Sequence, residues 1–255
     1  MDEMKKIIIY ALLITVVMAC NHNKNISEMN EKQVNEWLDN SEWRNLKIVP
    51  DESLNKYLFV KQNIINPTEW KAALNFLKEN GYNTITLRDL YQYWDYGKPL
   101  PTNPIILTFD DGYRSMYDFV MPELIKRDMV ATFFIITDKF NHPGYLNENM
   151  VQEIHRNGME IASHSHSHGD LRNADLEIEL NQSKTLLENI IDDAVYSFCY
   201  PCGLYNKNAI DHLAKYGYKI AVTTKYGEAS INQSIYELKR IRINKGDQIE
   251  NLIKK

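Results

Sequence analysis

The chain has 255 residues, of which 44% are hydrophobic, and its formal net charge is −5. This length and composition allow one sizeable hydrophobic core and fit one α/β domain. No cluster of Lys and Arg forms a basic stripe. Nucleic acid is therefore not expected as a partner, because phosphate binding depends on clustered positive charge.

The first twenty residues have the features of an export signal. Lys5 and Lys6 precede an apolar stretch, 7–17, that is too short to cross a bilayer comfortably. This stretch leads into VVMAC, which resembles the end of a bacterial lipoprotein signal. We therefore expect 1–20 to be a lipoprotein signal peptide, with the exported protein held at a bacterial membrane of the cell envelope by a lipid on Cys20. The alternative is that Cys20 is a buried or free thiol near an ordinary cleavage site.

A polar segment separates this signal from the main domain. The letters NHNKNISEMN after Cys20 are rich in Asn and offer nothing to bury, as in a tether. Residues 28–45 then show the apolar spacing of a short amphipathic helix. We expect 21–45 to be a tether with a short helix, and 46–255 to be the main domain.

Strand-like and helix-like segments alternate through that domain. The helix predicted at 66–81 has Pro67 near its start and Gly81 just past its end. Continuous apolar strands between helices predict a parallel sheet covered by helices, in either a closed barrel or a doubly wound sheet. The predicted strands are 82–87, 104–111, 129–137, 159–164, 194–201, 218–224 and 238–244, and the further helices are 115–127, 148–157, 174–191 and 206–216.

Polar residues gather where these strands end. Asp110 and Asp111 follow one strand, His164 follows another and Cys202 follows a third. Barrels and open α/β sheets place their sites at the carboxyl ends of parallel strands. We therefore expect a functional site at these strand ends.

The letters TFDDG place two neighbouring carboxylates, Asp110 and Asp111, at a strand end. Two such carboxylates are costly to keep ionised together unless a cation or a proton lies between them. The alternative is an ordinary turn, because Asp-Asp-Gly is also common turn chemistry.

The letters SHSHSHGDL contain His164 and His168, four residues apart, with His166 between them. Clustered imidazoles after a strand suit a divalent metal such as zinc. A polar surface loop or an adventitious metal binder is the alternative. Two His and one Asp would leave ligand positions open, as in hydrolytic zinc sites, and the spare Asp could deprotonate a water.

In this order and spacing, TFDDGY, SHSHSH and FCYPCGLYN resemble the polysaccharide deacetylases of carbohydrate esterase family four, over about Tyr57 to Ile253. The resemblance implies an irregular (β/α) barrel of the incomplete TIM-like, NodB-homology type. It also implies metal-dependent hydrolysis of N-acetyl or O-acetyl groups on sugars. The pattern Y-P-x-G-x-Y-N and the later L-x-R-I-R are similar to the branch that de-N-acetylates poly-β-1,6-N-acetylglucosamine.

Residue roles follow from this resemblance, position by position. Asp110 would be the general base and the backbone N–H of Cys202 would hold the oxyanion. Asp111, His164 and His168 would bind the metal, most simply Zn²⁺, with Co²⁺ or another first-row ion as alternatives. Tyr113, Tyr200 and Leu238 would contact the substrate, with Leu238 lining the acetyl pocket.

The third motif departs from the family pattern R-x-P-Y-G, because Cys199 stands at its Arg position and Cys202 at its Tyr position. Arg240 or Arg242 could replace the missing Arg, since both share a strand face with Leu238. We take Arg240 as the catalytic candidate, and surface salt bridging is the alternative for both. Outside the cytoplasm, a disulfide between the two cysteines is expected to stiffen the loop.

The family's usual proton donor, a His late in the chain, is missing because no His follows His212. The remaining candidates are His142, His155, His166 and His212, none at a matching position. The Trp of the fourth motif is missing too. Either Asp110 returns the proton itself, or the protein is slow or idle.

Four functions remain open at this point. The leading hypothesis is a metal-dependent hydrolase that removes N-acetyl groups from an N-acetylglucosamine-containing polysaccharide, which would be its partner. A catalytically weak or inactive glycan-binding lipoprotein, or an O-acetyl esterase on xylan-like glycans, would have the same fold. A thiol–disulfide oxidoreductase using Cys199 and Cys202 fits less well, because redox pairs usually begin a helix. The sequence indicates no protein partner.

Overall fold

In the computed structural model, residues 58–62, 67–244 and 246–253 are described. Strands and helices alternate along them and every strand pairing is parallel. The strands are β1 (Leu58–Gln62), β2 (Asn83–Ile85), β3 (Pro104–Phe109), β4 (Thr132–Ile135), β5 (Glu160–Ser163), β6 (Ser197–Cys199), β7 (Ile220–Tyr226) and β8 (Leu238–Ile243). The α-helices are α3 (Pro67–Glu79), α4 (Leu87–Tyr96), α5 (Met121–Ile125), α6 (Glu148–Arg156), α7 (Ser183–Ile191), α8 (Lys207–Lys215) and α9 (Ile249–Leu252).

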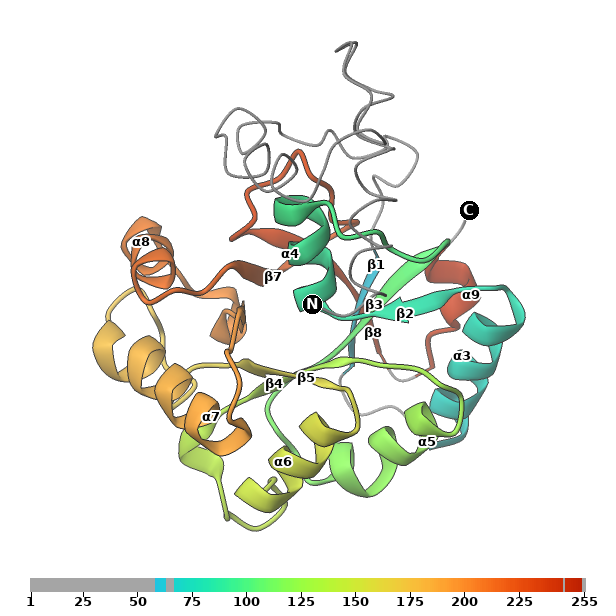
Figure 1. The fold of residues 1–255 in the computed structure, drawn as a ribbon, viewed down its shortest axis with the longest axis horizontal. Helices are drawn as coiled ribbons and strands as arrows, with labels where there is room; N and C mark the ends of the chain where they lie inside the picture. The colour runs from blue at the N-terminus through green and yellow to red at the C-terminus, as the bar shows by residue number, and fades with distance from the viewer. Residues whose placement is uncertain (1–57, 63–66, 245, 254–255) are drawn as a thin grey trace, which may run out of the picture. The chain divides into compact units, whose positions relative to one another are not determined.

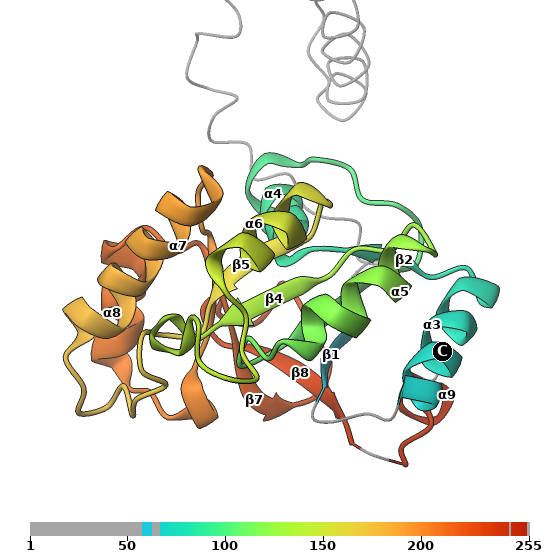
Figure 2. The same ribbon diagram turned by 90° about the horizontal axis from the view of Figure 1, so that it is seen from below.

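The strands close into a ring. The order runs β1-β8-β7-β6-β5-β4-β3, and β1 also pairs with β3, which joins the two ends. β2 lies beside the first half of β3, and β4 pairs with the second half. The helices surround the strands, with α3 and α9 side by side (Figures 1 and 2). The predicted irregular (β/α) barrel is confirmed.

Side chains of β3 alternate between two apolar cores. Ile105, Leu107 and Phe109 of β3 pack outward, in the core shared with the helices. Ile106 of the same strand packs in the core inside the barrel, with Phe134 of β4 and other inward residues. This alternation matters for the site, because the inward phase of β3 continues through Thr108 to Asp110.

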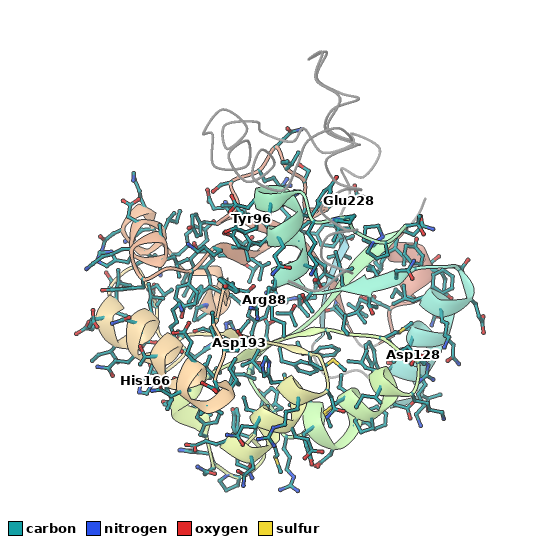
Figure 3. All side chains as sticks on the ribbon, in the orientation of Figure 1. Arg88, Tyr96, Asp128, His166, Asp193 and Glu228 are labelled. Carbon is teal, nitrogen blue, oxygen red and sulfur yellow. The ribbon has the colours of Figure 1, made fainter. Side chains whose placement is uncertain are left out.

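Helix α4 closes the amino end of the barrel. Its N-cap, Thr86, forms a capping box with Asp89. Leu87 and Leu90 belong to the core inside the barrel. The backbone N–H of Leu87 donates to Oγ1 of Thr132, at the start of β4, at 3.1 Å. Charged side chains near this end include Arg88 and Asp193, labelled in Figure 3, which form an ion pair.

The strands and helices predicted within the described residues all occur, most of them a few residues shorter than expected, whereas the helix predicted at 28–45 lies outside those residues. The long predicted helices at 115–127 and 174–191 each begin with a π-helical turn, over Met116–Val120 and Glu177–Gln182. Helix α4 was not predicted, because its capping residue Thr86 lay inside the segment expected to be a strand. None of the described helices is long and apolar enough to cross a membrane. The predicted signal, tether and Cys20 lie outside the described residues.

Candidate active site

The candidate site residues meet at the carboxyl end of the barrel. Asp110 directly follows β3, His164 directly follows β5, and Cys199 is the last residue of β6. Arg240 lies in β8, two residues after the inward-facing Leu238. The strand ends therefore bring together residues far apart in the sequence, as the sequence predicts.

Asp110 is held by a buried arginine. Asp110 is 3% exposed and Arg240 is 2% exposed. Nη1 of Arg240 donates to Oδ1 of Asp110 at 2.8 Å, and Nη2 donates to Oδ2 at 3.0 Å. Such a bidentate pair fixes the plane of the carboxylate as well as its position.

The remaining donors of Arg240 are also used. Its Nε donates to the carbonyl of Thr223 at 2.9 Å, Nη1 to Oγ1 of Thr108 at 3.2 Å, and Nη2 to Sγ of Cys199 at 3.1 Å. Burial lowers the pKa of this guanidinium, but the charges of Asp110 and Cys199 and the hydrogen bonds to both together outweigh burial and raise it. Arg242, the other candidate, is exposed. The structure therefore sets Arg240, and not Arg242, against the carboxylate.

Asp111, His164 and His168 form a second cluster beside this pair. Nε2 of His164 lies 3.4 Å from Oδ1 of Asp111, and Nε2 of His168 lies 3.7 Å from the same oxygen. One ligand atom from each residue falls within 4.8 Å of the other two. Two atoms bound tetrahedrally to one zinc ion at about 2.1 Å would be about 3.4 Å apart, so the spacing suits such an ion.

The orientation of His164 also fits a metal. Its Nδ1 lies 2.7 Å from the carbonyl of Cys199, so Nδ1 carries the proton and donates it. This leaves the lone pair of Nε2 facing the carboxylates, where Nε2 is buried and makes no hydrogen bond. A buried acceptor without a donor is costly, and a bound cation would satisfy it. The donor set of these residues therefore fits a first-row divalent ion.

Opposing effects act on the pKa of the His164 imidazole. Burial lowers the pKa of its imidazole, whereas the sulfur of Cys199 and the carboxylates of Asp111 and Asp110 raise it. The attraction is larger, and the pKa rises to about 10. The cluster is therefore arranged to favour a positive charge at this position.

The loops that carry the cluster have unusual backbone conformations. Asp111, Ser165 and His168 have φ values of 83°, 68° and 64°, in the left-handed region that non-glycine residues rarely adopt. Hydrogen bonds hold the second loop: Oγ of Ser165 accepts from the N–H of His168 at 3.0 Å. Glu179 accepts from the backbone N–H of Ser167 at 2.9 Å and from its hydroxyl. Conformations of this kind cost energy and persist where the surroundings enforce them.

The other histidines lie elsewhere. His166 (Figure 3) hydrogen-bonds the hydroxyl of Thr137 at 2.9 Å. His155 lies 3.6 Å from Asp193, and Nδ1 of His212 bonds the carbonyl of Asn208. His142 is exposed in the loop that precedes α6. Among the described residues, the potential metal groups contain no His other than His164 and His168.

The expected disulfide is not formed. Cys199 and Cys202 are free, the first buried and the second exposed. Cys199 faces inward, and its Sγ lies 3.4 Å from Oδ2 of Asp110. Cys202 lies in a 3₁₀ turn over Pro201–Gly203 with φ 51°. This turn is not the start of an α-helix, so the oxidoreductase alternative loses its physical basis.

Two of the three residues expected to contact the substrate are buried. Tyr200 is completely buried and stacks on Tyr205, with ring centroids 4.0 Å apart. Leu238 is completely buried in the core inside the barrel. Neither side chain has surface to offer a substrate. Tyr113 is 43% exposed and lies against Tyr145, with ring centroids 5.0 Å apart, so it remains a candidate.

Sequence reasoning missed several supporting residues. Thr108 and Thr223 hold Arg240, and Glu179 holds the loop after β5. Thr108 had a readable signal, since it lies two residues before Asp110 on the same strand face. Thr223 and Glu179 had none, because their partners are distant in the sequence.

Comparison with known proteins agrees with this geometry. Residues 97–221 match the family model described as polysaccharide deacetylase. The chain is 33% identical over 181 residues to YxkH of Bacillus subtilis, whose name assigns it to the polysaccharide deacetylases. That match covers 70% of this chain and 65% of YxkH, so the chain spans about two thirds of that relative. A poly-β-1,6-N-acetyl-D-glucosamine N-deacetylase of Staphylococcus aureus is 26% identical over 216 residues, covering 77% of this chain and 73% of the relative.

Solved structures show the same fold. The Streptococcus pyogenes deacetylase PplD, in complex with acetate, has a TM-score of 0.69 and 26% identity. That match covers 74% of this chain and 92% of PplD. A polysaccharide deacetylase structure from Bacillus anthracis, BA0330, has a TM-score of 0.70 and 26% identity, covering 78% of this chain and 69% of that one. The family model and these similar proteins show a polysaccharide deacetylase domain in this chain, and the buried aspartate with its adjoining Asp–His–His cluster lies within the matched residues.

Proposed function

We propose that the protein is a metal-dependent hydrolase that removes N-acetyl groups from a polysaccharide containing N-acetylglucosamine. The observation that carries this proposal is the adjacency of two units. One is Asp110, fixed by Arg240, and the other is the cluster of Asp111, His164 and His168. Amide hydrolysis needs both a base for water and an electrophile for the carbonyl.

In the proposed mechanism, Asp111, His164 and His168 hold a divalent ion, most simply Zn²⁺. When bound, the ion supplies Lewis-acid polarisation of the acetyl carbonyl and makes the attacking water more acidic. The side chains of Asp111 and His168 are 26% and 30% exposed, so this side of the cluster is open to a substrate. Tyr113 lies beside it and offers an aromatic surface to a sugar ring.

Asp110 takes the proton of the attacking water. The guanidinium of Arg240 favours the ionised carboxylate and prevents it from rotating away. The backbone N–H of Cys202 holds the developing oxyanion. Asp110 then returns the proton to the leaving amine, because the described residues place no other His in the cluster.

The similarity to poly-β-1,6-N-acetyl-D-glucosamine N-deacetylases supports a β-1,6-linked polymer as the substrate. The test is acetate release from β-1,6-linked and β-1,4-linked N-acetylglucosamine oligomers, peptidoglycan and acetylxylan, with added Zn²⁺ or Co²⁺. We expect release from the β-1,6-linked oligomers, and a loss of about 10²–10⁴-fold in Asp110→Asn. Cys202→Ser is the matched control, because it leaves the backbone N–H in place. Metal-dependent release from none of these glycans would contradict the proposal.

The missing donor His favours a second function, a glycan-binding protein without turnover. It predicts that the same oligomers bind to the metal-loaded protein and that no acetate appears. Preferential release from acetylxylan would instead indicate an O-acetyl esterase.

We also propose that the protein is exported and anchored to a membrane by a lipid on Cys20. The support is the VVMAC sequence after a short apolar stretch. Mass spectrometry of the amino-terminal peptide from the producing cell tests this. A lipid-modified Cys20 is expected, and an unmodified Cys20 in an exported chain would contradict it.

A further inference from the structure

Two potential metal groups share one histidine at the carboxyl end of the barrel. The outer group is Asp111, His164 and His168, and the inner group is Asp110, His164 and Cys199. Both groups use Nε2 of His164, because its Nδ1 is engaged with the carbonyl of Cys199. Because the two groups share this atom, only one of the two positions can hold an ion at a time.

The groups differ in burial. The side chains of Asp111 and His168 are 26% and 30% exposed. Asp110, His164 and Cys199 are 3%, 0% and 0% exposed. Catalytic metal sites keep an open position for water and substrate, whereas closed sites hold the ion on protein ligands. The inner group therefore suits an ion that is retained and not one that binds a substrate.

The distances of the inner group suit a cation. Sγ of Cys199 lies 3.4 Å from Oδ2 of Asp110, and Nε2 of His164 lies 3.9 Å from that oxygen. Ligand atoms about 2.0–2.3 Å from one tetrahedral ion are separated by about 3.3–3.8 Å, so the first distance lies within this range and the second lies just above it. Nε2 of His164 is buried without a hydrogen bond and lies within 3.9 Å of carboxylate oxygens of both groups, so it is available to an ion at either position.

Arg240 determines which ions can bind there. Its Nη2 lies 3.1 Å from Sγ of Cys199 and 3.0 Å from Oδ2 of Asp110. This positive charge opposes a cation, so only an ion with strong affinity for sulfur overcomes it. Hard ions, which prefer oxygen, are excluded.

We propose that Asp110, His164 and Cys199 form a second, inner binding site for a thiophilic divalent cation. Binding forms a sulfur–metal bond and releases the thiol proton of Cys199 to solvent. Because the ion takes His164 from the outer group and occupies the carboxylate of Asp110, it blocks the proposed hydrolysis. The binding itself does not rest on the proposed function.

The test uses Cd²⁺ as the probe and follows the ultraviolet sulfur-to-cadmium charge-transfer band. The chain has three cysteines, so Cys20→Ser/Cys202→Ser leaves Cys199 as the only thiol. Titration of this metal-free variant with Cd²⁺ is expected to give the band at one equivalent. Adding Cys199→Ser is expected to abolish it, with folding checked by circular dichroism.

A variant without the outer group keeps the test decisive if Cys199→Ser does not fold. Asp111→Asn/His168→Gln, in the same single-cysteine background, retains every inner ligand and is expected to keep the band. Absence of the band in the single-cysteine protein, or its loss in this outer-group variant, would overturn the proposal. These outcomes are independent of acetate release, so failure of the proposed enzymatic activity would leave the result standing.

Discussion

Each end of the barrel buries a carboxylate, and the two are held in different ways. At the carboxyl end, Asp110 pairs with the guanidinium of Arg240. At the amino end, Glu160 accepts, among the described residues, only from uncharged donors: the hydroxyls of Thr132 at 2.7 Å and Ser197 at 2.5 Å, and the backbone N–H of Arg88 at 3.0 Å.

This difference separates the carboxylate proposed as the base from a structural one. A buried carboxylate without a cation favours its protonated form, and burial indeed raises the pKa of Glu160, although its hydrogen bonds oppose the change. The Arg240 pair supports an ionised Asp110, which the proposed base needs. The amino end joins α4 to the strands, whereas the carboxyl end keeps charge inside the barrel.

The largest effect is expected from breaking the charged pair. Arg240→Met removes a buried cation and leaves Asp110 uncompensated, which should cost about 3–5 kcal/mol in the free energy of unfolding. Urea denaturation measures this cost. Asp110→Asn/Arg240→Met should cost less than Arg240→Met alone, because it leaves no unpaired charge. Equal costs for the single and double variants would show that the pair is not coupled.

Ala substitutions at two glycines test how tightly each end of the barrel is packed. Gly203 has φ 69°, and a Cβ there would lie 2.1 Å from Oγ1 of Thr224; Gly81, just before β2, has φ 71° and open space around it. Both Ala variants should lose about 1–2 kcal/mol through the backbone alone. Gly203→Ala should lose about 1–3 kcal/mol more from the overlap.

Thermal and urea unfolding of the two Ala variants check this difference. Gly203→Ala/Thr224→Ala, which removes most of the overlap, should recover part of the extra loss. Equal stabilities for Gly81→Ala and Gly203→Ala would contradict the crowding at the carboxyl end.

Glu160 should make stability depend on pH. Because its folded pKa is raised above the unfolded value of about 4.3, the folded protein binds more protons. The stability that Glu160 contributes is fully present below the unfolded pKa and is lost as pH rises through the folded pKa. Each tenfold difference between the acid constants of Glu160 in the folded and unfolded states changes the free energy of unfolding by about 1.4 kcal/mol. The test measures the free energy of unfolding of the wild type and of Glu160→Gln from pH 4 upward. The difference, wild type minus variant, should fall as pH rises. A difference independent of pH would refute the assignment.

The smallest effect is expected at the partly exposed ion pair of the amino end. Nη1 of Arg88 lies 2.5 Å from Oδ2 of Asp193, and the two side chains are 30% and 34% exposed. Such pairs contribute up to about 1 kcal/mol, and salt screens them. Arg88→Met should lose no more than this in urea unfolding, and less at high salt. A loss comparable to that of Arg240→Met would show that exposure does not distinguish the two ends.

The sequence alone determined most elements and the candidate site residues. Continuous apolar runs, helical spacing and the positions of Pro and Gly predicted the strands β2 to β8 and the longer helices, because these signals are local. The DD pair and the His-x₃-His spacing predicted Asp110, Asp111, His164 and His168 as one cluster. Helix α4 also had a local signal in Thr86 and Asp89, which the strand prediction obscured.

Only the tertiary structure decided what depends on the closure of the barrel. Period two places Arg240 and Arg242 on the same face, but only the register between strands shows that Arg240 is buried against Asp110. The same packing turned Cys199 inward, away from a disulfide, and buried Tyr200 and Leu238. Local patterns determine which face of a strand a residue occupies, whereas contacts between distant strands depend on how the ring closes.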